Sequence, residues 1–130
     1  IKAAAVADFR PTRRHPAKMK KSAAPAALEL EPTPDILAEL GRLKGDRLLV
    51  GFAAETENLR EEALRKLRAK NCDLVVANPV GQPGAGFDSD DNTALLVAAS
   101  GEVTEFPRGS KRELAARIFD LVHQLQPARR

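Results

Sequence analysis

Two short apolar runs of similar length constrain most strongly how this chain of 130 residues can fold. Residues 48–52 and 74–78 are each typical of a strand that is buried on both faces. Between them, the polar residues 55–58 introduce a helix that we expect to run to about Lys70. A strand, a helix and a strand in this order indicate a βαβ unit, and therefore a parallel sheet with a right-handed crossover.

The C-terminal part of the chain predicts a hairpin followed by a helix. Residues 94–99 and 103–106 flank Ser100-Gly101-Glu102, which is typical of an antiparallel hairpin at a sheet edge. Ser110 and Glu113 match a capping box, and the apolar residues after them share one helical face. We therefore expect a three-layer, Rossmann-like α/β fold with a mixed, mostly parallel sheet and an antiparallel hairpin at one edge.

The N-terminal part is less regular. Residues 1–6 predict a buried strand that is already under way, so we expect an upstream part to be missing from the chain. Prolines at 11, 16 and 25 predict a long loop over residues 9–27, with a short strand at residues 28–30. Thr33 as N-cap and Pro34 at the first helical position predict a helix that ends near Arg42.

Composition excludes several classes of protein. A net charge of +3, with acidic and basic residues interspersed, argues against a nucleic-acid tail or a polybasic membrane patch. The lack of Trp and Tyr argues against stacking on single-stranded nucleic acid. Cys72 is the only cysteine, so we expect a packing residue and a reducing compartment. No apolar run is long enough to span a bilayer, and we predict a cytoplasmic protein.

Lysines occupy unusual positions in the helix predicted over residues 58–70. Helical geometry places Lys66 and Lys70 beside the apolar stripe, whereas Arg65 and Arg68 lie on the opposite side. Two lysines one turn apart are suited to a multiply charged anion such as a triphosphate. The alternative is that both side chains extend past the edge of the core to water.

Other candidate residues lie at the ends of predicted elements. Asp8 follows the first predicted strand, at the end where open α/β sheets bind ligands, and is equally suited to capping a turn. The turn at residues 34–37 offers free N–H groups to an anion or a base edge, or is an ordinary helix cap. His15 has no partner at a spacing typical of a catalytic motif.

The long loop is strongly basic, and its like charges repel each other unless an anion binds among them. It is either a flap that orders over a phosphate or a solvated loop. Its basic residues are Arg10, Arg13, Arg14, Lys18, Lys20 and Lys21. The sequence contains no GxGxxG fingerprint, Walker A motif or zinc-ligand cluster, which argues against a Rossmann oxidoreductase and a P-loop enzyme.

Several of these segments, taken in order, resemble the phosphopantothenate-cysteine ligase family, the synthetase half of the bacterial bifunctional coenzyme A biosynthesis flavoprotein. The resemblance covers nearly the whole chain. It rests on Ala3-Ala4-Ala5-Val6-Ala7-Asp8-Phe9-Arg10-Pro11, Lys18-Met19-Lys20-Lys21, Thr33-Pro34-Asp35-Ile36-Leu37, residues 51–56, Lys66 with Lys70-Asn71, and Ala77-Asn78 with residues 86–92.

The resemblance implies a CTP-dependent ligation through an acyl-cytidylate, with Mg²⁺ to offset the triphosphate charge. It implies that Lys18 is catalytic, that Ala4, Ala5 and Asn78 bind 4′-phosphopantothenate, and that residues 79–92 face a homodimer partner. The CTP-binding residues it implies are Ala3, Ala4, Asp8, Lys18, Pro34, Asp35, Ile36, Leu37, Phe52, Lys66 and Lys70.

The chain also departs from the family. The family's upstream phosphate-binding loops are absent, as is the flavin-dependent decarboxylase domain often fused before the ligase, so FMN is not expected to bind. We therefore expect residues 1–130 to be most of a single CTP-dependent ligase domain without its N-terminal segment, and to have little ligase activity alone. The alternative is a non-catalytic nucleotide-binding module that keeps the CTP pocket.

Overall fold

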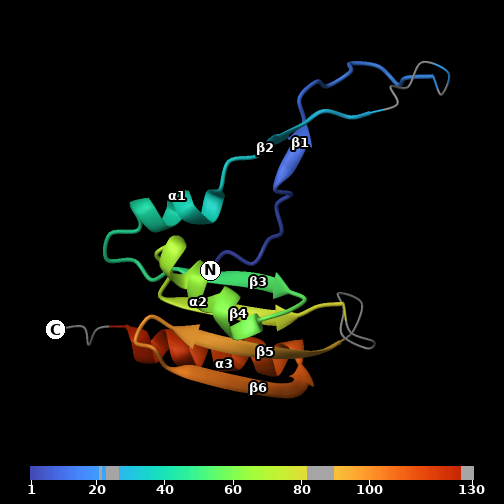
Figure 1. The fold of residues 1–130 in the computed structure, drawn as a ribbon. Coiled ribbons are helices and arrows are strands. Elements are labelled where there is room, and N and C mark those ends of the chain that lie inside the picture. The colour runs from blue at the N-terminus through green and yellow to red at the C-terminus, as the bar shows by residue number, and fades with distance from the viewer. Residues whose placement is uncertain (21, 23–26, 82–89, 127–130) are drawn as a thin grey trace. The chain divides into compact units, whose positions relative to one another are not determined.

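The computed structural model describes residues 1–20, 22, 27–81 and 90–126. The chain divides into two compact units, and each is described by itself. The sheet unit consists of Ile1–Ala3 and Leu37–Arg130, and the hairpin unit consists of Ala4–Ile36. Figure 1 shows the elements of both units in chain order.

The sheet unit is built on a four-stranded mixed sheet with the order β3-β4-β5-β6. These strands are β3 (Val50–Glu55), β4 (Leu74–Pro79), β5 (Asp91–Ala98) and β6 (Val103–Ser110). β3 and β4 are parallel, whereas β5 is antiparallel to both β4 and β6. The predicted α/β fold, the parallel pair of the βαβ unit and the edge hairpin are confirmed.

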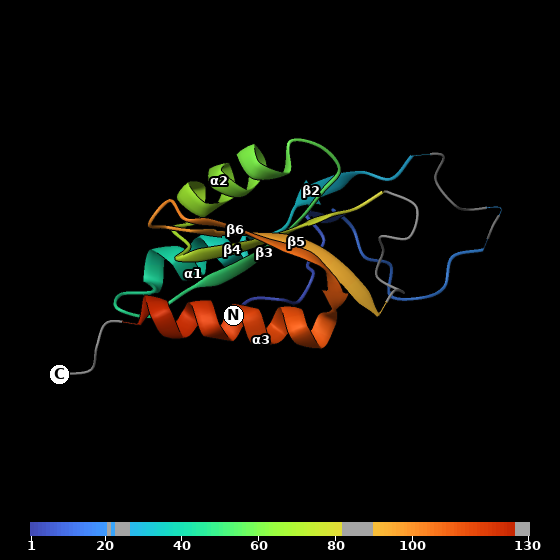
Figure 2. The same cartoon turned by 90° about the horizontal axis from the view of Figure 1, so that it is seen from below.

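Two helices cover opposite faces of this sheet, α2 (Leu59–Ala69) and α3 (Lys111–Leu125) (Figure 2). Side chains alternate along β4, so that Val75 contributes to the core under α2 and Val76 to the core under α3. From the helices, Leu67 of α2 and Ile118 of α3 pack into these cores. The predicted three layers follow from this two-sided burial.

Strand β6 leads into α3 without an intervening loop. Ser110 is the last residue of β6, where it pairs with Asp91, and it is also the N-cap of α3. Its side chain accepts a hydrogen bond from the Glu113 amide (3.2 Å), and the Glu113 carboxylate accepts one from the Ser110 amide (2.8 Å). The predicted capping box is confirmed.

The first strand of the βαβ unit lies later than predicted, at residues 50–55 and not 48–52. The reason is a polar contact just before it: the Leu49 amide donates to a carboxylate oxygen of Asp73 (2.7 Å) and so does not bond to a neighbouring strand. Lys44 Nζ donates to both oxygens of the same carboxylate (2.8 and 2.9 Å). Asp73 thereby joins the segment before β3 to the start of β4.

The hairpin unit contains two short antiparallel strands, β1 (Phe9–Pro11) and β2 (Leu30–Pro32). The prediction of irregular structure throughout residues 9–27 is wrong at β1, and the predicted strand at 28–30 lies two residues later. A proline is tolerated in a two-stranded sheet because both strands are edge strands, where a missing N–H need not face the partner. Arg10 and Glu31 form an exposed ion pair across the strands (2.7 Å).

Two predictions near the N-terminus and the first helix are wrong. Among the described residues, the expected strand over residues 1–6 is reduced to a parallel bridge between Lys2 and Gly51, and Val6 is 46% exposed. The small apolar residues of this segment could be buried, but no other element that the structure describes packs over them. Helix α1 (Ile36–Leu43) starts later than predicted, because Thr33 is bonded to the segment before β1: its amide donates to the Asp8 carbonyl (2.9 Å) and its hydroxyl to the Ala7 carbonyl (2.5 Å).

No helix in the described part of the chain is long and apolar enough to cross a membrane.

Gly41 marks a close approach between α1 and the end of α2. A Cβ atom at this position would lie 1.9 Å from the Lys70 carbonyl oxygen, which belongs to the backbone and cannot turn away. We therefore expect Gly41→Ala to lower the free energy of unfolding by about 1–3 kcal/mol, measured by urea denaturation. Glu39→Ala, on the exposed side of the same helix, is the control, and an unchanged Gly41→Ala midpoint would contradict the packing.

Cys72 is a packing residue, as predicted: its side chain lies in the core under α2 and the residue is 3% exposed. Burial raises the pKa of the Cys72 thiol. As pH rises, the unfolded chain therefore loses this proton first, so the free energy of unfolding should fall above the unfolded pKa of about 8.5. Cys72→Ala removes the thiol and should therefore reduce that fall.

Iodoacetamide tests the burial directly. It should alkylate Cys72 slowly in the native chain at pH 8 and fast in the urea-unfolded chain, and equal rates would contradict the burial.

Candidate functional site

The predicted site residues fall in both units. In the sheet unit, the best-defined group surrounds Lys66 of α2. Lys66 Nζ lies 2.7 Å from Oε1 of Glu55, the last residue of β3, and both side chains are largely buried, with 29% and 18% of their surface exposed. Lys66 therefore neither extends freely to water nor presents an uncompensated charge. Its ammonium is held by a carboxylate that the sequence did not indicate.

A second ion pair joins two residues of the same helix, Arg65 and Glu62. The Arg65 guanidinium donates two hydrogen bonds to Glu62 (2.9 and 2.7 Å). The hydrogen bond from Arg65 lowers the pKa of the Glu62 carboxyl, and the same bond raises the pKa of Arg65. Arg65 is 62% exposed, which agrees with its predicted position on the solvated side. The four formal charges of the two pairs sum to zero.

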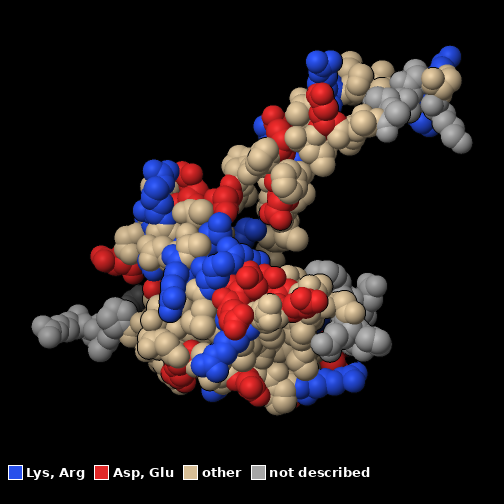
Figure 3. All heavy atoms as spheres, viewed as in Figure 1, with Lys and Arg blue, Asp and Glu red and all other residues tan. Residues whose placement is uncertain are grey.

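The surface of the sheet unit shows the same balance at a larger scale. In Figure 3, basic and acidic side chains are interspersed over the face in view, and no broad region of one sign covers it. An anion that binds this face must therefore recognise particular side chains. This agrees with the composition, which predicts that anion binding is local.

Lys70 ends helix α2, and its backbone is tightly held. Its amide donates to the Lys66 carbonyl (2.9 Å), and its own carbonyl faces Gly41 of α1. The next residue, Asn71, adopts a positive φ of 50°, and its side chain donates to the Gly41 carbonyl (2.9 Å). The end of α2 is thus fixed against α1, and Leu37 of α1 packs on the same core as α2.

Phe52 lies on the other face of the sheet. It is partly buried in β3 and packs against the core under α3, whereas Lys66 belongs to the helix on the opposite face. Side chains alternate along a strand, so Phe52 and Glu55 project to opposite faces. The structure therefore brings Lys66, Lys70 and Leu37 to one side of the sheet unit and places Phe52 on the other.

Asn78, predicted to bind phosphopantothenate, lies near the C-terminal end of β4. Its side-chain amide donates to the Thr93 carbonyl of β5 (3.0 Å). This hydrogen bond fixes the side chain beyond the last backbone pair between β4 and β5, which joins Ala77 and Leu95. Most of the predicted partner-facing loop, residues 82–89, lies outside the described residues.

In the hairpin unit, the structure joins two predicted CTP-binding segments that are far apart in the sequence. The Thr33 amide donates to the Asp8 carbonyl (2.9 Å), so Asp8 lies next to the residue that precedes Pro34. Ile36, the first residue of α1, belongs to the same unit, and Ala4, Ala5, Asp8, Pro34 and Asp35 are all exposed. Sequence reasoning missed this contact because it depends on the β1–β2 pairing.

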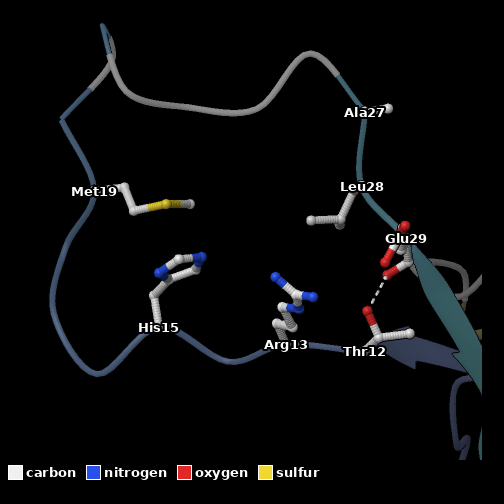
Figure 4. Close-up of a pocket in the computed structure, with 7 residues that line it drawn as sticks. All are labelled: Thr12, Arg13, His15, Met19, Ala27, Leu28 and Glu29. Atoms are coloured by element: carbon white, nitrogen blue, oxygen red, sulfur yellow. Dashed lines mark hydrogen bonds between the residues drawn. The ribbon is translucent and has the colours of Figure 1, made fainter.

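In the hairpin unit, residues on both limbs of the basic loop line an open cavity of about 350 Å³ (Figure 4). His15 and Met19 project from one limb of the loop toward Leu28 on the other limb. Lys18 and Lys20 are exposed, and Lys21 lies outside the described residues. The cavity is lined by Thr12, Arg13, His15, Met19, Ala27, Leu28 and Glu29. His15, which has no motif partner in the sequence, is therefore part of a cavity wall.

Within the described ranges, no group of three or more His, Cys, Asp or Glu residues is arranged to hold a metal ion. The carboxylates of Glu55 and Glu62 are paired with Lys66 and Arg65, respectively.

The chain is similar to known proteins over nearly its whole length. Residues 1–125 match the model of the DNA/pantothenate metabolism flavoprotein C-terminal domain. The chain is 46% identical over 125 residues to the coenzyme A biosynthesis bifunctional protein CoaBC of Bacillus subtilis, covering 96% of this chain and 31% of that protein. A cysteine/cysteine sulfinic acid decarboxylase from an unknown prokaryotic organism is 41% identical over 128 residues, with 95% and 36% covered.

Among solved structures, the C-terminal domain of a coenzyme A biosynthesis bifunctional protein CoaBC matches with a TM-score of 0.72 and 38% identity. The match covers 94% of this chain and 51% of the solved one. The chain spans about a third of the length of the curated relatives it matches.

Proposed function

Because the chain belongs to the family of the DNA/pantothenate metabolism flavoprotein C-terminal domain, we propose that it forms part of a phosphopantothenate-cysteine ligase of coenzyme A biosynthesis. The observation that carries the proposal is the 46% identity to Bacillus subtilis CoaBC over 96% of the chain. The enzyme is cytoplasmic and homodimeric in this proposal, and a flavin-dependent decarboxylase domain is often fused before the ligase. We do not expect FMN to bind this chain.

The proposed reaction has two steps and uses CTP. The carboxylate of 4′-phosphopantothenate attacks the α-phosphorus of CTP, pyrophosphate leaves, and an acyl-cytidylate forms. The cysteine amine then attacks the acyl carbon, CMP leaves with the bonding electrons, and the amide of 4′-phosphopantothenoylcysteine remains after loss of a proton. Mg²⁺ would be held by the phosphate oxygens of CTP, whose negative charge it would offset.

The side chains of this chain have distinct roles in the proposal. Lys18 is the catalytic residue, and its positive charge stabilises the negative charge that develops on the cytidylate phosphate as CMP leaves in the second step. Phosphopantothenate contacts Ala4, Ala5 and Asn78. CTP contacts Ala3, Ala4, Asp8, Lys18, Pro34, Asp35, Ile36, Leu37, Phe52, Lys66 and Lys70. The backbone contact between Asp8 and Thr33 supports this set, since it joins two of its segments.

The second candidate function is that of a nucleotide-binding module without catalytic activity. The module would bind CTP with the same residues but would not transfer a cytidylyl group. The paired state of Lys66 is compatible with both candidates, so affinity alone does not separate them. Nucleotide binding tests what they share, and turnover by the whole enzyme tests where they differ.

Calorimetric titration of residues 1–130 with CTP and with ATP, each with Mg²⁺, tests the shared prediction. We expect CTP to bind more tightly than ATP, and Lys66→Ala to weaken CTP binding by about tenfold, the loss of a charge-assisted hydrogen bond. Arg65→Ala removes the same charge from the exposed side of the same helix and is the matched control, with an unchanged Kd expected. Equal binding of both nucleotides, or none, would refute the assigned pocket.

Lys18→Gln in the full-length enzyme separates the two candidates. For a ligase, we expect the variant to release one equivalent of pyrophosphate as the acyl-cytidylate forms, and then to make no phosphopantothenoylcysteine. Quenched-flow measurement of both products provides the test. Lys111→Gln, an exposed lysine at the start of α3, should turn over normally. Normal turnover by Lys18→Gln would remove Lys18 from the chemistry, and absence of turnover in the parent enzyme would favour the binding module.

A further inference from the structure

We propose that Glu55 is a positioning residue for Lys66, which it holds in the place from which Lys66 binds a phosphate of the nucleotide. The inference rests on the proposed function, because it concerns the same nucleotide site. Glu55 is not among the residues that the family resemblance assigns to that site.

The backbone of both partners is fixed. Glu55 is the last residue of β3, it lies opposite Pro79 in the parallel ladder, and its carbonyl accepts the Val80 amide (2.9 Å). On α2, Lys66 is flanked by Ala63 and Leu67, which are 0% and 7% exposed and pack into the core. The backbone of neither partner can therefore move without disturbing the β3–β4 ladder or the packing of α2.

The position of the pair is the one at which a ligand is expected. Glu55 ends β3 at the carboxyl edge of the parallel pair β3–β4, and open α/β sheets bind ligands outside this edge. A lysine side chain in a helix points back toward the N-terminus of the helix. Lys66 Nζ reaches Oε1 of Glu55 at 2.7 Å, so the carboxylate keeps the ammonium close to that edge.

Charge alone does not explain why a carboxylate should lie beside a phosphate-binding lysine. Glu55 cancels the charge of Lys66, and the neighbouring Glu62 and Arg65 cancel each other, so these two pairs together give no net attraction for an anion. A free lysine side chain has many rotamers, and fixing one of them lowers the affinity for a ligand. The ammonium has three donors, so it can keep Glu55 as a partner while it donates to a phosphate oxygen. Holding Lys66 in place is therefore the contribution that Glu55 makes.

Two substitutions of Glu55 separate the effect of its hydrogen-bond acceptor from the effect of its negative charge. Glu55→Gln removes the negative charge but keeps an oxygen that accepts a hydrogen bond from Lys66, whereas Glu55→Ala removes both. If Glu55 positions Lys66, we expect Glu55→Ala to weaken binding of CTP with Mg²⁺ by about five- to tenfold, and Glu55→Gln by less than about threefold. Calorimetry on residues 1–130 measures both values.

A double-mutant cycle shows whether Glu55 acts through Lys66. In the Lys66→Ala background, Glu55→Ala should change the Kd for CTP by less than about twofold, because its partner is already absent. Glu57→Ala, an exposed glutamate close to the same strand end, is the matched control and should bind CTP as the parent does. Thermal unfolding of each variant checks that the fold is kept. Acetylation of Lys66, followed by mass spectrometry, should be faster in Glu55→Ala than in the parent chain.

The possible outcomes separate a failure of the role proposed for Glu55 from a failure of the proposed nucleotide site. Tighter CTP binding in both Glu55 variants would mean that the carboxylate competes with the phosphate, and would overturn the inference. An unchanged Kd in Glu55→Ala, together with weaker binding in Lys66→Ala, would overturn the inference and leave the proposed function intact. Failure of the parent chain to bind CTP would refute the proposed nucleotide site, and the inference with it.

Discussion

The burial of β4 on both of its faces is the constraint on which the rest of the sheet unit depends. Leu74 and Val76 project into one core, Val75 and Ala77 project into the other, and all four are at most 1% exposed. A shift of one residue in register would exchange these two sets, so the pairing with β3 and β5 is strongly specified. Hydrophobic burial therefore decides where Asn78 at the end of this strand must lie.

The same constraint determines the surroundings of Lys66. Helix α2 packs on β3 and β4 through Ala63 and Leu67, and this packing brings a lysine of the helix to a glutamate of the strand. A polar contact with a specific partner thus arises from apolar packing. The family match over residues 1–125 agrees with this fold, and it confirms the family predicted from the ordered motifs. Each of the two units by itself holds some of the residues that we predict to bind the nucleotide.

Local signals predicted the elements that depend on local interactions. The βαβ pattern, the hairpin around Gly101 and the capping box at Ser110 were all correct, because periodicity, turn chemistry and capping act over a few residues. The errors occurred where a distant segment decides the conformation. Thr33 has the chemistry of an N-cap, but its hydroxyl donates to the Ala7 carbonyl. Pro11 lies in a strand because it pairs with Leu30 in a two-stranded sheet, in which both strands are edge strands.

In the candidate site, too, local features were predicted and contacts between distant segments were not. Helical geometry placed Lys66 beside the apolar stripe and Arg65 on the solvated side, and both positions agree with the structure. The partner of Lys66 was not predicted, because the approach of Glu55 depends on how α2 crosses β3. The placement of Phe52 on the opposite face follows from strand parity, which could have been read from the sequence had the strand been assigned to residues 50–55. The cavity at His15 and Leu28 depends on two segments joined by the β1–β2 pairing.

The double role of Ser110, which ends β6 and caps α3, has a consequence for how this part of the molecule can change. No spacer separates the hairpin from the helix, so the direction of the α3 axis is set by the last strand pair of the sheet. We expect β5, β6 and α3 to open and close as one cooperative segment in hydrogen exchange. Inserted residues are easily accommodated at the exposed turn of Gly101. At Ser110, inserted residues would separate α3 from the end of β6 and remove the helix residues that cover this face of the sheet.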